Sequence, residues 1–108
     1  MGDVNYAYDN FCDAIDKMAV NSGTIKDRLY IAYVQFSPVT EKDFPEELKA
    51  DYNWVIEKLT NKNPVFDEGS VRGTLFGMHT KTAVKIAEKI LLIRNSLESF
   101  VWIILNQD

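Results

Sequence analysis

The sequence predicts an all-α protein, a helical bundle of four main helices at about residues 4–21, 25–36, 45–60 and 80–105 with a short helical turn near 70–78. Within the four long segments, apolar residues recur at steps of three and four, the period of a helix with one buried face. Gly and Pro fall between these segments or at their starts. No strong strand pattern of period two accompanies them.

The first helix, about 4–21, is indicated by an apolar stripe with steps of four and three. We expect the buried members of that stripe to be Val4, Tyr8, Phe11, Ile15 and Met18. Ser22-Gly23 ends the helix, because Gly is the usual residue just past a helix C-terminus.

The second helix, about 25–36, begins after Thr24. Thr24 and Asp27 form a variant capping box, with Asp in place of the more common Glu three residues after the N-cap. The side expected to be buried comprises Leu29, Ala32, Tyr33 and Phe36. Ser37-Pro38 ends the helix, since a residue before Pro avoids helical geometry.

The third helix, about 45–60, starts at Pro45, where a missing N–H has no cost. Glu46 and Glu47 follow and complement the positive end of the helix dipole. The expected buried stripe is Leu48, Tyr52, Val55 and Leu59. Residues 61–70 are then expected to form a polar connection. The segment 70–78 is expected to be only a short helical turn, because Gly73 and Gly77 each disfavour a helix interior by about 1 kcal/mol.

The last helix, 80–105, organises the rest of the chain. One face is apolar and comprises Ala83, Ile86, Ala87, Ile90, Ile93, Leu97, Val101 and Ile104. Leu92 and Ile103 are the apolar residues expected on the polar side. A helix of this length measures about 39 Å at roughly 1.5 Å per residue, whereas a compact globule of this size is about 33 Å across. We therefore expect its apolar end, Phe100–Leu105, to overhang the core and to require cover. A β-strand over the same residues is the structural alternative.

Composition restricts the possible classes. A chain of 108 residues with 46% apolar content suits one folded domain. The net charge of −4 disfavours generic binding to nucleic acid or to anionic lipid. The single cysteine, Cys12, allows no internal disulfide, which suits a reducing cytoplasm. We expect a cytoplasmic protein without a membrane anchor.

Several short motifs occur together over residues 28–97. This pattern resembles small, uncharacterised helical proteins of bacteria and phages, and the resemblance implies a helical fold without implying a reaction or a cofactor. The matching pieces are Arg28-Leu29 with Ala32-Tyr33, Asp43-Phe44-Pro45-Glu46-Glu47-Leu48, Leu59-Thr60, Asp67-Glu68-Gly69-Ser70, and Met78 with Lys81-Thr82-Ala83-Val84-Lys85-Ile86-Ala87-Glu88-Lys89-Ile90.

Residues that suggest catalytic chemistry each have a simpler interpretation. His79 has no second histidine with which to share a metal ion, and Cys12 lies among aspartates, whereas a reactive thiolate needs a positive environment. We expect Cys12 to be a buried, unreactive thiol. The glycines at 69, 73 and 77 lack the Gly-Lys-Ser/Thr of a phosphate-binding loop. Asp9, Asp13 and Asp16 are interpreted as a solvated helix face. The sequence thus predicts no catalytic, cofactor-binding or metal-binding residues, and no enzyme.

Two sets of residues suggest binding. Lys81, Lys85 and Lys89 form a row at successive i,i+4 positions, which is a possible electrostatic docking site. Residues expected to take part in self-association or partner binding are Trp54, Leu92, Phe100, Trp102 and Ile103, because tryptophans and exposed apolar residues often anchor interfaces. We therefore expect a non-enzymatic protein-binding protein that self-associates, as a homodimer, through its C-terminal helix. The alternative is a nucleic-acid-linked regulator that uses the lysine row.

Overall fold

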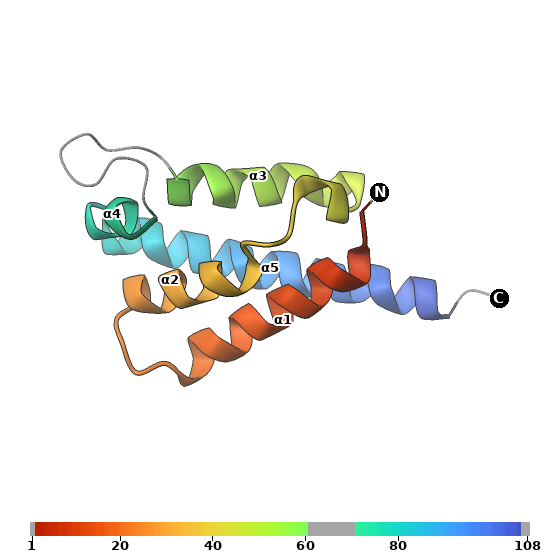
Figure 1. The fold of residues 1–108 in the computed structure, drawn as a ribbon, viewed down its shortest axis with the longest axis horizontal. Coiled ribbons are helices and arrows are strands. Elements are labelled where there is room, and N and C mark those ends of the chain that lie inside the picture. The colour runs from red at the N-terminus through yellow and green to blue at the C-terminus, as the bar shows by residue number, and fades with distance from the viewer. Residues whose placement is uncertain (1, 61–70, 107–108) are drawn as a thin grey trace.

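The structure, a computed structural model, describes residues 2–60 and 71–106. Its elements in chain order are α1 (Val4–Val20), α2 (Ile25–Phe36), the 3-10 helix η1 (Glu41–Asp43), α3 (Glu46–Thr60), α4 (Val71–Phe76) and α5 (Thr80–Leu105). Helix α5 runs along the molecule, with α3 on one side and α1 and α2 on the other (Figure 1). The prediction of an all-α helical bundle is confirmed. The described residues contain no strand, so Phe100–Leu105 is helical.

Side-chain caps fix where the first two helices begin. The carboxylate of Asp3 accepts hydrogen bonds from the backbone N–H groups of Asn5 and Tyr6 at the start of α1. At the start of α2, the predicted capping box is present: the Thr24 side chain accepts from the Asp27 N–H, and the Asp27 carboxylate accepts from the Thr24 N–H. Each cap satisfies backbone donors that the first helical turn leaves without partners. The expected polar connection, 61–70, lies outside the described residues.

One hydrophobic core lies where α1, α2 and α3 pack against α5. From α5 it takes five fully buried side chains: Ala83, Ile86, Ile90, Ile93 and Leu97. From α3 it takes the four residues that the periodicity predicted: Leu48, Tyr52, Val55 and Leu59. Helix α5 is therefore the common surface on which the other three long helices assemble.

The buried stripe predicted for α1 is only partly correct. Phe11 is fully buried, but its buried companions are Ala7 and Ala14 rather than the larger residues on either side. Helix α1 packs against both α2 and α5, and the small alanines face this seam. The larger members of the predicted stripe lie half-buried at its rim: Val4, Tyr8, Ile15 and Met18. In α2, Tyr33 is likewise half-buried, with its ring edge-on to Phe36 at 5.6 Å between centroids.

Aromatic contacts connect α1 to the segment between α2 and α3, where the Phe11 ring lies edge-on to Phe44 with 5.7 Å between centroids. Phe11 stacks on Phe36 with ring centroids 4.7 Å apart, and Phe44 stacks on Tyr52 at 4.4 Å. The Tyr52 hydroxyl donates a buried hydrogen bond of 2.8 Å to the carbonyl of Val39. This bond holds the segment after α2 against α3.

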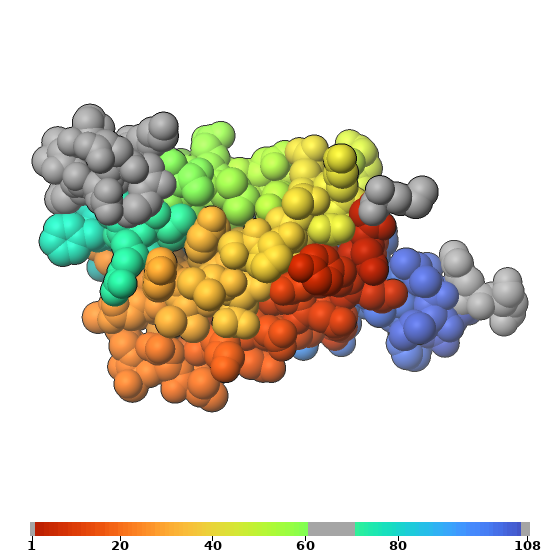
Figure 2. Space-filling view, in the orientation of Figure 1, coloured from red at the N-terminus to blue at the C-terminus, as the bar shows by residue number. Residues whose placement is uncertain are grey.

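The molecule is elongated, with extents of 53 × 28 × 20 Å, so the assumption of a roughly spherical globule was wrong. The longer core covers more of α5 than expected. Phe100 packs against the core and is half-buried, which corrects its predicted place in the overhang. Ile104, expected on the buried face, is 47% exposed because the core ends before it. The end of α5 projects beyond α1 (Figure 2).

The two sides of α5 should respond differently to the same kind of truncation. Ile90→Ala removes a fully buried side chain and should lower the free energy of unfolding by about 2–5 kcal/mol, because a cavity remains. Leu91→Ala, the matched control, alters a 45% exposed neighbour and should change that free energy by less than about 0.5 kcal/mol. Urea unfolding followed by circular dichroism measures both. Equal losses would contradict the assigned orientation of α5.

Tyr52 should make the fold sensitive to alkaline pH. Burial raises the pKa of its hydroxyl above the ordinary value of 10.0. At a pH between the ordinary pKa and the raised pKa, the Tyr52 hydroxyl of the folded protein keeps a proton that the unfolded chain has lost. The stabilisation from the protonated hydroxyl is therefore present below about pH 10 and is lost as pH rises through the raised pKa. Tyr52→Phe should weaken the fall in unfolding free energy above about pH 10, whereas Tyr6→Phe, at an exposed position, should retain it. A parallel decline in all three proteins would exclude Tyr52 as its source.

Candidate functional site

The end of α5 exposes four consecutive large apolar side chains. Trp102, Ile103, Ile104 and Leu105 are 65%, 55%, 47% and 72% exposed, and we call them the α5 overhang. Consecutive helical residues point in four directions around the axis, so no single neighbouring surface of the same bundle covers them. The overhang lies beyond the core rather than over it (Figure 2). It is the densest group of exposed apolar side chains among the described residues.

A second exposed group lies on the side of α5 opposite the core. Val84, Leu91 and Leu92 are 40%, 45% and 46% exposed. They share this side with short or polar side chains, and we call the whole set the outer face of α5: Lys81, Val84, Lys85, Glu88, Leu91, Leu92, Asn95 and Ser99. An open hollow of about 480 Å³ on it is lined by Glu88, Leu91, Leu92, Asn95, Ser96 and Ser99. Exposed apolar side chains thus occur both at the overhang and at the middle of the helix, with the polar Asn95 and Ser99 between them.

A hollow of about 510 Å³ joins the overhang to α1. Trp102 and Ile103 line it together with Glu98 and Ser99 of α5 and Tyr8 of α1. The indole is therefore beside a polar rim rather than isolated in solvent. Interfaces commonly have this composition, with an aromatic anchor next to groups that can form hydrogen bonds.

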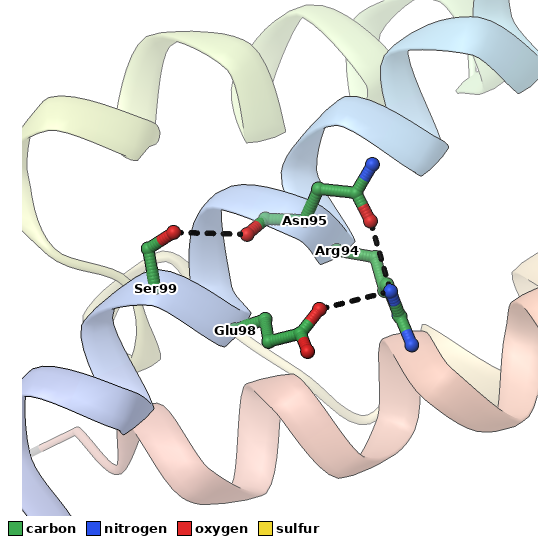
Figure 3. Close-up of polar contacts among 4 residues, drawn as sticks. All are labelled: Arg94, Asn95, Glu98 and Ser99. Carbon is green, nitrogen blue, oxygen red and sulfur yellow. Dashed lines mark hydrogen bonds and ion pairs between the residues drawn. The ribbon is translucent and has the colours of Figure 1, made fainter.

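A polar cluster between α1 and α5 was missed by the sequence reasoning. The guanidinium of Arg94 donates to Asn95 Oδ1 at 2.9 Å and to Glu98 Oε1 at 3.1 Å (Figure 3). Interaction with the Cys12 side chain raises the pKa of Arg94 above its ordinary value, and a separate interaction between Tyr8 and Cys12 is the main cause that raises the pKa of the Tyr8 hydroxyl. The i,i+4 spacing of Arg94 and Glu98 could have indicated their pair, but nothing in either helix alone indicates a contact with Cys12.

Cys12 is half-buried rather than buried as expected. Its neighbours include the cationic Arg94 as well as the aspartates of α1, because α5 passes beside it. The cluster spans the α1–α5 seam and joins the two helices next to the overhang. We assign it a structural role.

The row of three lysines is not uniform. Lys81 and Lys85 are exposed, as a docking site requires. Lys89 instead forms an ion pair with Asp51 of α3, with 3.1 Å between Nζ and Oδ1, and lies 5.5 Å from the centre of the Trp54 ring. Only two of the three lysines in the row are therefore exposed, and electrostatic docking through the row stays a prediction. The exposed basic surface of the row then consists of Lys81 and Lys85, whereas the nucleic-acid alternative requires all three lysines.

Trp54 has partners within its own chain. Its half-buried ring packs against the core, and Lys58 Nζ lies 5.7 Å from the ring centre in addition to Lys89. A tryptophan between two ammonium groups gains from cation–π attraction. The structure places Trp54 on the α3–α5 seam, away from the α5 overhang, and its role as an interface anchor stays a prediction.

The other candidate residues are dispersed. His79 is exposed at the N-cap position of α5, and Asp9, Asp13 and Asp16 are exposed on α1. In residues 2–60 and 71–106, no three His, Cys, Asp or Glu side chains gather as metal ligands would. Across those residues, too, every helix is shorter or less apolar than a membrane span requires.

A third hollow, of about 1100 Å³, opens at the far end of the molecule between the α1–α2 connection, α2 and α4. Its lining combines the aliphatic Ile31 with charged groups, and Arg72 stacks over the Tyr30 ring at 4.9 Å. Helix α4 directly follows residues 61–70, which the structure does not describe. We therefore assign no ligand to this hollow.

Comparison with known protein families, with curated proteins and with solved structures finds no match. The resemblance to small bacterial and phage helical proteins stays a prediction. The functional argument therefore rests on the geometry of α5.

The Asp51–Lys89–Trp54 contact should stabilise the fold. Lys89→Met keeps the aliphatic part of the side chain but removes its charge, and should lower the unfolding free energy by about 0.5–1.5 kcal/mol, the combined range of a half-exposed ion pair and a cation–π contact. Lys85→Met, at an exposed lysine one turn earlier, is the matched control and should have almost no effect. Urea unfolding at low salt measures the difference. If both variants unfold alike, the contact contributes nothing.

Proposed function

We propose that this protein is a non-enzymatic interaction protein that self-associates through α5. The single observation that supports the proposal most directly is the α5 overhang, with Trp102 at 65% and Leu105 at 72% exposed. A contiguous apolar group of this kind in a soluble protein marks an interaction surface more often than a solvated one.

The energetics favour covering this surface. Burial of apolar area contributes about 25 cal/mol per Å², and a buried tryptophan is among the commonest side chains to dominate binding energy. The overhang offers an indole and three branched aliphatic side chains on one rigid helix. Because the helix is already formed, little backbone entropy is lost on binding.

A second copy of the chain is the partner that is always present at matching concentration. Such a homodimer would cover the same surface on both chains at once, as a two-fold interface does. Beyond self-association, the proposal is that the pair binds a further protein, as an accessory subunit or as a phage or mobile-element inhibitor of a host complex. The resemblance over residues 28–97 motivates that second step.

Within the part of the chain that the structure describes, nothing in the geometry favours the nucleic-acid alternative. Lys81 and Lys85 remain exposed on α5, but Lys89 is engaged by Asp51 and Trp54. Two exposed lysines on a chain of net charge −4 provide few phosphate contacts.

Self-association should depend on the overhang. At micromolar concentration the unaltered chain should have the mass of a pair in sedimentation equilibrium or light scattering. Trp102→Ala combined with Ile103→Glu should shift the mass to that of one chain, because a carboxylate at an apolar contact is costly to bury. Val34→Glu is the matched control, since Val34 on α2 is a β-branched residue with a similar exposed fraction, 46% against 55% for Ile103.

A single-chain mass for the unaltered protein at these concentrations would refute self-association. An equal loss of pairing in Val34→Glu would show that added charge, rather than the overhang, is responsible.

A further inference from the structure

We propose that the outer face of α5 binds the outer face of α5 in a second copy, in antiparallel orientation, with the two-fold axis passing near Leu92. This inference rests on the self-association proposed above and adds which surface is used and in which direction the two helices run. It follows from the distribution of apolar, small and charged residues along α5.

The centre of the outer face can accept a helix. Leu91 and Leu92 are 45% and 46% exposed and stand at the middle of Thr80–Leu105. Beside them the short side chains Ser96 and Ser99 line the open hollow of about 480 Å³. Large side chains next to small ones form the ridges and grooves through which two helices interdigitate. Near a two-fold axis, the leucines of one copy meet those of the other.

Charge selects the direction. Lys81, Lys85 and Glu88 occupy the N-terminal half of the outer face, while its C-terminal half carries the neutral Asn95 and Ser99. Two parallel helices in register would set each charge against its own copy, which is unfavourable. Antiparallel helices set the charged half of one copy against the neutral half of the other. The helix dipoles are then also opposed, which is favourable.

In this antiparallel arrangement the overhang of one copy lies against the N-terminal half of α5 in the other. The two-fold rotation, with its axis near the midpoint of Thr80–Leu105, places Trp102 opposite roughly residues 81–85 of the second copy. In that segment Val84 is 40% exposed and offers apolar contact. Lys81 and Lys85 flank it, and their ammonium groups are suited to the face of an indole. Trp102 and Ile103, the two overhang residues on the side of the outer face, therefore lie against the N-terminal half of the other α5, and one two-fold interface covers this pair in both copies.

Engineered cysteines test the arrangement directly. Lys85→Cys and Ser99→Cys are prepared as two separate full-length proteins and mixed under mild oxidation. In the antiparallel pair, these two positions lie almost opposite each other. Residue 99 of one copy and residue 99 of the other would instead lie about 20 Å apart along the helix axis, at roughly 1.5 Å per residue. A disulfide requires Cα atoms within about 7 Å.

The expected product is the disulfide between unlike chains, Lys85→Cys with Ser99→Cys, in excess over both like-chain disulfides. Peptide mass spectrometry identifies it and separates it from any product of Cys12. Glu57→Cys, at an exposed position of α3, is the matched control and should cross-link with neither variant.

Each other result overturns the proposal in a distinguishable way. An excess of like-chain disulfides at both positions indicates parallel pairing. Yields equal to those of Glu57→Cys, in a protein whose mass is that of a pair, show that another surface is used, such as a head-to-tail contact or the overhang alone. Self-association then stands while the antiparallel arrangement fails. A single-chain mass refutes both.

Discussion

The fold depends on one apolar stripe along α5. Five of its side chains are fully buried, and α1, α2 and α3 each pack against the helix that carries them. Because a helix satisfies its own backbone hydrogen bonds, α5 needs the other helices only to cover its side chains. The length of the apolar stripe therefore determines how much of α5 belongs to the core.

The stripe and the helix end at different places. Full burial stops at Leu97, half-burial continues through Phe100 and Val101, and the helix continues to Leu105. Over the last turn the apolar residues stop following the three-four period and occupy every position. A last turn that served only as a solvent-exposed helix end would be expected to carry polar residues there. The mismatch between where burial ends and where apolar composition ends is the feature on which the proposed function depends.

Periodicity predicted the buried residues of some helices well because it reports which face of a helix is apolar. In α3 all four predicted residues are buried, because this helix packs against one long helix, α5, with only the short α4 and η1 beside it, and so has one main inner direction. In α1 the same reasoning failed. That helix contacts two neighbours, and the deepest line of the seam is occupied by Ala7 and Ala14. Small residues fit where helices approach most closely, whereas a hydrophobicity pattern gives weight to the large ones.

Contacts between helices were the other source of error. Lys89 looked like the third member of an exposed row because its partner, Asp51, belongs to a different helix. The contact of Arg94 with Cys12 was unpredictable for the same reason. The overhang was anticipated from helix length against globule size, but its start was placed too early, since the actual core is elongated. Sequence alone specified which helices form, and their mutual arrangement decided which polar groups stay exposed.

The two faces of α5 are interleaved along one stretch of chain. Ile90 is fully buried, whereas its neighbour Leu91 is 45% exposed. Adjacent positions therefore face different physical constraints: Ile90 must fit the interior, whereas Leu91 must suit what lies outside the bundle. A substitution at an exposed position of this helix therefore changes what the surface presents without altering the bundle beneath.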